Sequence, residues 1–424
     1  MKMVKLKNEI SSDWEFVKLE DVIKDIYYGI TAKAVEDNTD IRMLRTTDIK
    51  NYSVDWESLP YCEITEKNNN LQKYFLKKDD LIVARAGTVG VSVLIERDFD
   101  NTIFGSYLIK IRLKSNVLPK FVHYFFQTDI YWNHITKAQG STLKNINLPL
   151  LKSLKIPLPP LSEQRKIAEI LSTVDNAIQK VSDAIAKTER LKKGLMHELL
   201  TRGIGHERFK FSKELGCEIP EGWKVVRLGD IAKLESGGTP SRQKPEYWKN
   251  GTIPWIKSGE LNDGIIYDAE EKISEFGLKN SSTKMFRKGT LLIALYGRGT
   301  VSKTAILGID AATNQAVGAI IPINSSFDPK FMQYYLIFSR NKLLGQVVNP
   351  SSDVGRTNIY LSSLKLFKVP LPPLPEQRKI TEILSTVDKK LELERKQKEK
   401  LEKIKKGLMY DLLTGRMRVK VDGS

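Results

Sequence analysis

Two long stretches of the chain repeat apolar residues at steps of three and four positions. The first runs from Ser162 to Leu200, and the second follows Pro375 and reaches Leu412. Because this spacing places the apolar residues on one face of an α-helix, each stretch predicts an amphipathic helix. At about 1.5 Å per residue the first helix would be roughly 58 Å long, which is too long for a core element of one domain. Two helices of equal length with matching stripes are expected to pair.

The apolar positions of the two stripes are the ones expected to face the other helix. The pairing residues predicted in this way are Ile167, Ile170, Leu171, Val174, Val181, Leu195, Ile380, Ile383, Leu384, Val387 and Leu408. Leu191 and Ile404 continue the same stripes. Residues 394–400 interrupt the second stripe with charged and polar side chains, which fits either an exposed turn of the helix or a surface for a partner subunit.

The segments in front of the helices, residues 1–155 and 204–368, alternate short apolar runs with turns. These runs lie at residues 81–84, 91–95, 108–113, 291–295 and 319–323. Helical patterns follow them at 119–132 and 329–344. Each front segment therefore predicts a strand-rich α+β domain.

The two halves of the chain are copies of one another. Residues 156–175 and 369–388 are identical at 17 of 20 aligned positions, beginning with Pro-Leu-Pro-Pro-Leu and continuing through Glu-Gln-Arg-Lys-Ile. The same alignment continues without insertion to the end of both helices, whereas the front segments share only scattered residues. The repeat divides the chain into a front segment 1–155, a helical region 156–203, a second front segment 204–368 and a second helical region 369–424. The near-copied regions are expected to perform one shared task, and the divergent ones the same kind of task on different targets.

The chain carries a net charge of +17, with 41% hydrophobic and 28% charged residues. Such a composition is ordinary for a globular protein, and the excess of positive charge favours a polyanionic partner, with nucleic acid as the first expectation. A lysine-rich solvated surface is the alternative. Cys62 and Cys217 have no metal-ligand spacing, and neither a signal peptide nor a membrane-spanning stretch is apparent, so a reducing cytoplasm is expected.

Sequence motifs typical of catalysis are incomplete in this chain. Gly297–Thr304 approaches the phosphate-binding loop G-x-x-x-x-G-K-[ST], but Ser302 replaces its second glycine and the following residues read as a strand instead of a helix. Asn349-Pro350 shares only two residues with the Asn/Asp-Pro-Pro-aromatic loop of amino-methyltransferases. The four histidines form no ligand or triad spacing. The chain is therefore expected to bind rather than to catalyse.

The doubled Pro-Leu-Pro-Pro-Leu-(Ser/Pro)-Glu-Gln-Arg-Lys-Ile motif, each time opening a long helix after a divergent domain, resembles the specificity subunits of type I restriction-modification systems. The resemblance covers essentially the whole chain. It implies two target-recognition domains, separated by two helices that pair as an antiparallel coiled coil. It also implies a non-catalytic scaffold that binds a bipartite, asymmetric DNA target and docks modification subunits, expected to number two, together with restriction subunits. S-adenosylmethionine, ATP and Mg²⁺ are then expected on the partner subunits only.

Candidate DNA-facing residues follow from polarity and from positions in loops beside strands. In the first domain they are Arg42, Arg45, Thr46, Thr47, Asp48, Arg85, Thr88, Ser141, Thr142, Lys144 and Asn145. In the second domain they are Lys257, Ser258, Glu260, Tyr296, Arg298, Arg356, Thr357 and Asn358. Arginine, asparagine and carboxylate side chains pair with the edges of guanine, adenine and cytosine, respectively. About half of the candidates are expected to touch phosphate or nothing.

Two other classes of protein share part of this pattern. A DNA-binding regulator with an internal pseudo-dimer would also be basic and repeated, but it calls for a compact reading head such as a helix-turn-helix. A self-sufficient methyltransferase or an NTPase requires motifs that the sequence lacks. Neighbouring genes for a methyltransferase and a helicase-nuclease would distinguish the three.

Overall fold

The computed structural model describes residues 14–37, 39–64, 71–137, 145–297, 299–347 and 358–420. The chain forms two compact units, one from Met1–Asp183 with Lys396–Ser424 and one from Ala184–Arg395. Each unit therefore contains one front segment of the sequence together with part of each long helix.

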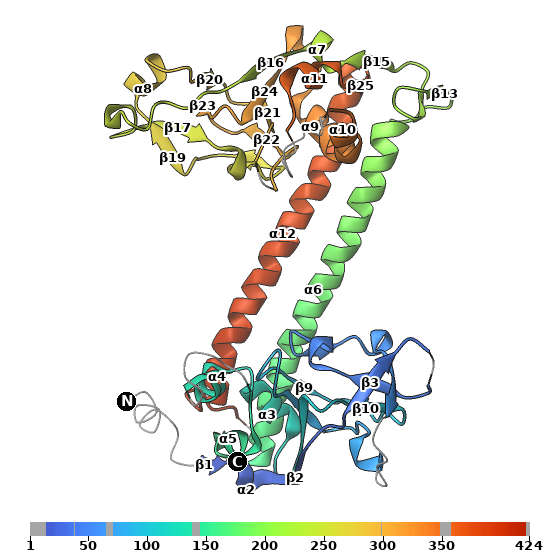
Figure 1. Ribbon diagram of the computed structural model, residues 1–424, viewed down its shortest axis with the longest axis vertical. Helices are drawn as coiled ribbons and strands as arrows, with labels where there is room; N and C mark the ends of the chain where they lie inside the picture. Colours follow the sequence, from blue (N-terminus) through green and yellow to red (C-terminus); the bar gives the residue numbers. More distant parts are fainter. Residues whose placement is uncertain are drawn as a thin grey trace. The chain divides into compact units, whose positions relative to one another are not determined.

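The two predicted helices are confirmed. Helix α6 spans Leu161–Thr201 and helix α12 spans Leu374–Leu413, with 41 and 40 residues. Both are drawn as unbroken coils in Figure 1. Each follows a Pro-Pro pair that keeps the preceding chain extended, and Pro375 occupies the first turn of α12, where a missing N–H costs no hydrogen bond.

Within the second unit the two helices pair in antiparallel fashion. The Lys192 Nζ lies 2.6 Å from an Asp388 carboxylate oxygen, and the Thr188 hydroxyl donates to Glu394 over 3.2 Å. Rising residue numbers on α6 thus meet falling numbers on α12. Leu391 is buried one turn before Glu394, so the charged interruption of the stripe begins with a polar contact inside the helix pair.

The strands of the first unit form two four-stranded sheets. One has the order β2 (Ile23–Tyr28), β11 (Leu108–Leu113), β8 (Leu81–Ala84), β9 (Ser92–Leu94), and the other β10 (Thr102–Phe104), β4 (Arg42–Leu44), β7 (Tyr61–Ile64), β3 (Ala32–Val35). A two-stranded ribbon, β1 (Glu15–Lys18) with β12 (Lys155–Leu158), joins the domain to the start of α6, and β5 (Ile49–Lys50) pairs with β6 (Ser53–Val54). The helices beside them are α2 (Leu19–Val22), α3 (Pro119–Phe125), α4 (Asp129–Lys137) and α5 (Leu148–Lys152).

The second unit repeats this plan. Its sheets have the orders β16 (Ala232–Ser236), β24 (Val317–Pro322), β21 (Leu291–Ala294), β22 (Thr304–Leu307), β18 (Ile265–Ile266), and β19 (Glu271–Ile273), β17 (Ile253–Ile256), β23 (Ala311–Thr313), β20 (Met285–Phe286). The ribbon pairs β15 (Lys224–Arg227) with β25 (Lys368–Leu371), and a hairpin joins β13 (Phe209–Ser212) to β14 (Cys217–Pro220). The helices are α7 (Leu228–Ile231), α8 (Glu275–Lys279), α9 (Pro329–Phe338), α10 (Arg340–Val347) and α11 (Leu361–Leu366).

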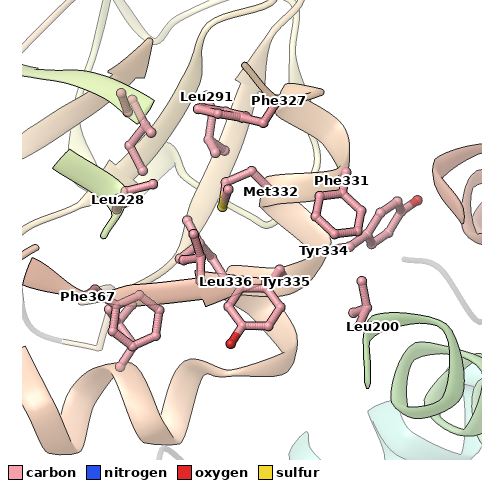
Figure 2. Packing of buried hydrophobic residues seen from close by; sticks show 14 of the residues in the cluster. Leu200, Leu228, Leu291, Phe327, Phe331, Met332, Tyr334, Tyr335, Leu336 and Phe367 are labelled. Atoms are coloured by element: carbon pink, nitrogen blue, oxygen red, sulfur yellow. The ribbon is translucent and has the colours of Figure 1, made fainter. Parts of the chain in front are cut away.

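The main core of each unit joins the domain to the long helices. In the second unit Leu200 of α6 packs in one cluster with Phe331 and Tyr334 of α9, shown in Figure 2, and Ile380 and Leu384 of α12 belong to the same cluster. The first unit has the matching cluster, in which residues from α3, α6 and the last turns of α12 are buried together. The strand-rich domain and the helices therefore share one hydrophobic core in each unit.

The predicted helical segments 119–132 and 329–344 are each broken into two helices. In the first, Thr128 lies at the break and its hydroxyl donates to the Phe125 carbonyl over 2.7 Å. In the second, the hydroxyl of Ser339 donates to the Tyr335 carbonyl over 2.7 Å. Because such side-chain bonds compete with the helical backbone pattern, the periodicity alone missed both breaks.

Candidate DNA-recognition surfaces and helix junctions

Each recognition domain meets the long helices through a set of residues that we call the helix junction. The junction of the first unit includes Trp14, Tyr124, Glu163, Gln164, Asp175 and Lys405. The junction of the second unit includes Trp223, Tyr334, Glu376, Gln377, Asp388 and Lys192. In each case the helix residues belong to the near-copied part of the sequence.

A glutamine and a tryptophan tie the domain to the first turn of each helix. Gln164 accepts from the Leu118 backbone N–H and donates to the Pro159 carbonyl, both over 2.8 Å. The Trp14 indole N–H donates to Glu163 over 3.1 Å. In the second unit Gln377 and the Trp223–Glu376 pair make the equivalent bonds.

A tyrosine, an aspartate and a lysine join the domain to both helices at once. In the first unit the Tyr124 hydroxyl donates to Asp175 over 2.8 Å, and Lys405 of α12 lies 2.7 Å from the same carboxylate. In the second unit Tyr334 donates to Asp388 over 2.6 Å, and Lys192 of α6 completes the set at 2.6 Å. In the first unit α6 supplies the aspartate and α12 the lysine. In the second unit α12 supplies the aspartate and α6 the lysine, as an antiparallel repeat requires.

The residue before the junction tyrosine differs in its chemistry between the two units. His123 is partly buried beside Tyr124, and burial lowers the pKa of its imidazole to about 4, with the nearby Lys405 and Lys120 acting in the same direction. The equivalent position of the second unit holds Gln333, which is fully buried and cannot titrate. At this position the first junction therefore carries an imidazole that resists protonation, and the second carries an amide.

The ends of the central strands form a second region, in which the two units share the backbone but differ at several side chains. The Arg85 N–H donates to the Tyr107 carbonyl, as the Leu295 N–H does to the Ala316 carbonyl, at 2.9 and 2.8 Å. Gly29 and Gly237 occupy one further equivalent position, where a Cβ would lie 2.2 and 2.1 Å from the backbone of the neighbouring strand. Only glycine fits so close an approach.

In the first unit this strand-end surface holds Tyr28, Arg85 and Asn145. The Arg85 guanidinium carbon lies 4.3 Å from the centre of the Tyr28 ring, a cation–π geometry. The backbone N–H of Ile146, next to Asn145, donates to the Arg85 carbonyl over 2.8 Å. Two residues predicted from the sequence, Arg85 and Asn145, are thereby brought close together.

In the second unit the strand-end surface holds Thr239, Tyr296, Gln315 and Asn358. Tyr296, Gln315 and Asn358 line one cavity of about 410 Å³. Tyr296 and Asn358 were predicted from the sequence, whereas Gln315 was missed. It lies in a short loop between β23 and β24, and only the pairing of distant strands brings it to the other two.

The remaining candidates of the first domain bond mainly to one another or to the backbone. Arg45 holds Asp48 with two hydrogen bonds of 2.7 and 3.0 Å. Arg42 donates to the Glu57 carbonyl over 2.7 Å. The Thr88 hydroxyl donates to the Thr46 carbonyl over 3.0 Å, so these two lie together, and the neighbouring Thr47 is exposed.

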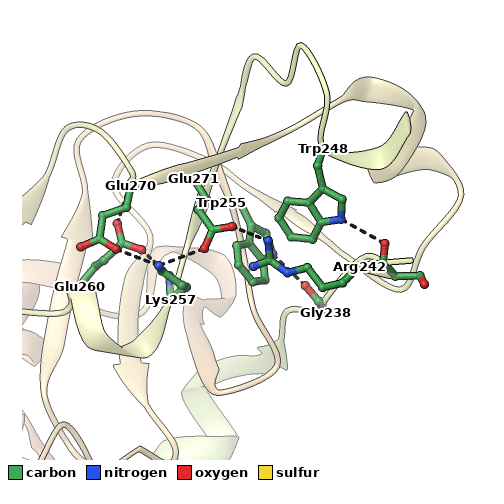
Figure 3. Close-up of polar contacts among 9 residues, drawn as sticks. Gly238, Arg242, Trp248, Trp255, Lys257, Glu260, Glu270 and Glu271 are labelled. Atoms are coloured by element: carbon green, nitrogen blue, oxygen red, sulfur yellow. Dashed lines mark hydrogen bonds and ion pairs between the residues drawn. The ribbon is translucent and has the colours of Figure 1, made fainter. Parts of the chain in front are cut away.

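In the second domain Lys257 is held by carboxylates, as Figure 3 shows. Its Nζ lies 2.8 Å from Glu270 and 3.1 Å from Glu271, and bonds to both carboxylates raise the pKa of Lys257. Glu260 accepts from the backbone N–H groups of Lys257 and Glu270, at 2.8 and 3.0 Å. The candidate Ser258 is buried beside them.

A second cation stands at the other end of this cluster. The guanidinium carbon of Arg242 lies 3.6 Å from the centre of the Trp248 ring, and the guanidinium also pairs with Glu271 over 2.5 Å. Arg242 was not among the residues predicted from the sequence. No local pattern marks it, because its acidic partner comes from a separate strand.

Six of the predicted DNA-facing residues lie outside the described residues: Ser141, Thr142, Lys144, Arg298, Arg356 and Thr357. All of the predicted pairing residues lie within the described part. Ile167, Leu171, Ile380 and Leu384 are buried, and Ile170, Val174, Val181, Leu195, Ile383, Val387 and Leu408 are partly buried. Leu191 and Ile404, which continued the stripes, are 52% and 43% exposed. The prediction that these two residues belong to the contact face was wrong. They occupy equivalent positions of the repeat.

The segment that resembles a phosphate-binding loop is followed by strand β22 (Thr304–Leu307), as expected, and so lacks the helix N-terminus that such loops use. In the described part of the chain, no three or more His, Cys, Asp or Glu side chains are grouped so that they could hold a metal ion. Among the same residues, no helix is long and apolar enough to cross a membrane.

Comparison with known proteins identifies a family whose model matches both halves of this chain. The family model described as type I restriction modification DNA specificity domain matches residues 11–188 and again residues 220–403. Each match takes in one recognition domain and most of the long helix that follows it. The family resemblance seen in the repeated motif is thus confirmed.

Individual relatives agree. The type I restriction enzyme MjaVIII specificity subunit of Methanocaldococcus jannaschii is 28% identical over 424 residues, which cover 97% of this chain and 94% of the relative. The EcoR124I/EcoR124II specificity subunit of Escherichia coli is 30% identical over 241 residues, 55% of each chain. The crystal structure of the S subunit of a type I restriction-modification system from M. genitalium has the same fold, with a TM-score of 0.59 and 18% identity, covering 96% of this chain and 97% of that one.

Proposed function

The chain belongs to the type I restriction-modification DNA specificity family, and from this premise we propose that its two strand-end surfaces read the two halves of one DNA target. The chain is a DNA-recognition subunit and not a catalytic one; its partners are DNA and the modification and restriction subunits of the system. The observation that carries the proposal is the contrast within the repeat. Both domains use the same junction and the same strand framework, and both present an asparagine at one strand-end position, but they differ at others, such as Ser106 and Gln315.

The division of labour follows the repeat. We propose that residues 1–155 and 204–368 are the two target-recognition domains, and that the helical regions 156–203 and 369–424 hold them and dock the partner subunits. Since the helical region occurs twice, with 17 of the first 20 residues identical, we propose two modification subunits. S-adenosylmethionine, ATP and Mg²⁺ belong to the partner subunits in this scheme, and the complex acts on DNA in the cytoplasm.

Among the predicted DNA-facing residues, we propose that Arg85, Asn145, Tyr296 and Asn358 face bases. An arginine stacked on an aromatic ring is suited to guanine, and an asparagine amide is suited to adenine. The pairs Arg45–Asp48 and Lys257–Glu270 already satisfy their charges. We propose that they, with Arg42, Thr46, Thr47, Thr88, Ser258 and Glu260, shape the face around the reading residues. Ser141, Thr142, Lys144, Arg298, Arg356 and Thr357 remain proposed contacts from the sequence.

The experiment is reconstitution of the full chain with its modification subunits, followed by mapping of the methylated sites on genomic DNA. The expected result is one bipartite motif whose two half-sites differ. A complex that methylates without sequence preference, or at one unbroken site, contradicts the proposal. The purified chain alone is expected to show no methylation, cleavage or ATP hydrolysis.

A second set of variants tests whether the helices set the spacing of the target. Insertion of one heptad after Val181 and one after its repeat equivalent Glu394 lengthens both helices by about 10 Å, which corresponds to about three base pairs. The half-sites are expected to stay the same while the spacer grows. The control carries the insertion in α6 only and should lose activity, because the two stripes then fall out of register. Altered half-sites with an unchanged spacer would exclude this role for the helices.

A further inference from the structure

Gln315 is a strand-end residue of the second domain whose side-chain amide is held at its oxygen. It lies between β23 and β24 and is exposed. The Thr239 hydroxyl donates to its Oε1. Gln315 lines one cavity together with Tyr296 and Asn358. A glutamine whose amide oxygen is held has less conformational freedom to lose when it binds a ligand.

The hydrogen bonds that this amide can still make indicate which kind of ligand it suits. A glutamine side chain has two N–H donors and an oxygen with two lone pairs. Because Thr239 occupies one lone pair, the amide keeps its N–H donors and one acceptor side by side. A phosphate offers acceptors only, whereas the major-groove edge of adenine offers an acceptor at N7 beside a donor at N6.

We propose that Gln315 reads an adenine in the half-site bound by the second recognition domain, with Thr239 as a positioning residue. The inference rests on the proposed function and names a base-reading residue that the sequence did not indicate. At Gly237 an added Cβ would lie 2.1 Å from the Thr313 carbonyl, so glycine permits a close approach of the backbone here. This approach brings the chain that carries Thr239 next to the loop of Gln315.

The equivalent position of the first domain does not carry an amide. Gln315 lies two residues before Val317, the partner of Ala294 in the β21–β24 pair. The equivalent residue before Leu108, the partner of Ala84 in the β8–β11 pair, is Ser106. Since serine cannot make the paired donor and acceptor contact, the effect of Gln315 is confined to one half of the target.

The test uses the full chain reconstituted with its modification subunits and compares methylated sites in genomic DNA. In Gln315→Leu the preference for adenine at one position of one half-site should fall roughly 5- to 150-fold, with the other half-site unchanged. In Gln315→Glu the N–H donor is lost, and the preference at that position should move toward cytosine, whose N4 amino group is a donor. Thr239→Val should relax the same position by a smaller factor.

The controls separate the possible failures. Ser106→Ala should leave the second half-site unchanged, and all variants should keep the melting temperature of the wild type because Gln315 lies at the surface. A wild-type complex without a bipartite motif refutes the proposed function itself. A wild-type complex that has such a motif, with a Gln315→Leu variant that keeps it in full, overturns only the role of Gln315. Equal weakening at every DNA sequence also overturns it, since that result identifies a phosphate contact.

Discussion

The helix junctions and the strand-end surfaces of this protein differ in what the repeat preserves. At the junctions, Gln164 and Gln377 make the same two bonds. The tyrosine-to-aspartate distances are 2.8 and 2.6 Å, and the lysine-to-aspartate distances are 2.7 and 2.6 Å. At the strand ends, the backbone bonds agree but only some of the side chains do: Asn145 corresponds to Asn358, whereas Ser106 in one unit corresponds to Gln315 in the other. The part that must hold any domain on the helices is therefore constant, and the part that must distinguish DNA sequences is free to change.

The largest effect is expected when the matched core residues of the two junctions are replaced, which tests whether the junctions are equivalent. Phe121 and Phe331 are both fully buried, so substitution of either by alanine should lower the free energy of unfolding by about 3–5 kcal/mol. If the junctions are equivalent, the two costs should agree within about 1 kcal/mol. Denaturant unfolding of the full chain with hydrogen exchange resolved for each unit measures both. A cost near zero in one unit would show that its domain is not anchored as its twin is.

His123 allows the two junctions to be separated by pH. Its pKa of about 4 in the folded chain lies below the ordinary value of 6.5, so the unfolded chain binds the proton first as the pH falls. The free energy of unfolding contributed by this site is thus intact above pH 6.5, declines between about 6.5 and 4, and changes no further below 4. The loss amounts to at most about 3 kcal/mol.

The variant His123→Gln copies the residue of the second junction and provides the matched control. It should remove this part of the acid sensitivity from the first unit and leave the second unit unchanged. Thermal unfolding at several pH values between 4 and 7.5 measures the difference. Equal pH dependence of the wild type and the variant would mean that the imidazole is protonated as readily in the folded chain as in the unfolded one.

The sequence predicted the constant regions better than the variable ones, for a physical reason. A long helix is determined by local periodicity, so the predicted bounds of α6 and α12 nearly coincide with the observed ends. Leu191 and Ile404 were misplaced because the residues next to them, Lys192 and Lys405, face the contacts at these positions and pair with Asp388 and Asp175. Gln315 was missed because its neighbours Thr239 and Tyr296 come from distant parts of the sequence, and no local pattern records which loops the sheet brings together.

At the strand ends, Asn145 and Asn358 offer a matched pair, since they occupy equivalent positions of the repeat. Alanine at either position should reduce discrimination in its own half-site by about 1–3 kcal/mol and leave the other half-site unchanged. The measurement is competition binding of the reconstituted complex to targets with single base changes in each half-site. If one substitution affects both half-sites, or only the overall affinity, then the residue supports the fold or contacts phosphate and does not read a base.

The smallest effect is expected at Lys257, because its charge is already shared with Glu270 and Glu271. The Lys257 side chain is 31% exposed, and such ion pairs contribute roughly 0–1 kcal/mol to stability. If the ammonium stays with the carboxylates when DNA binds, Lys257→Met should leave the dependence of binding on salt concentration unchanged. A lysine that neutralises a phosphate would instead reduce the slope by about 1. Glu270→Gln is the informative partner variant, since it removes one carboxylate while Glu271 stays held by Arg242. Without the Glu270 carboxylate, the Lys257 ammonium should reach a phosphate and make the salt dependence of binding steeper. A reduced slope in Lys257→Met would show that the wild-type lysine already makes that contact.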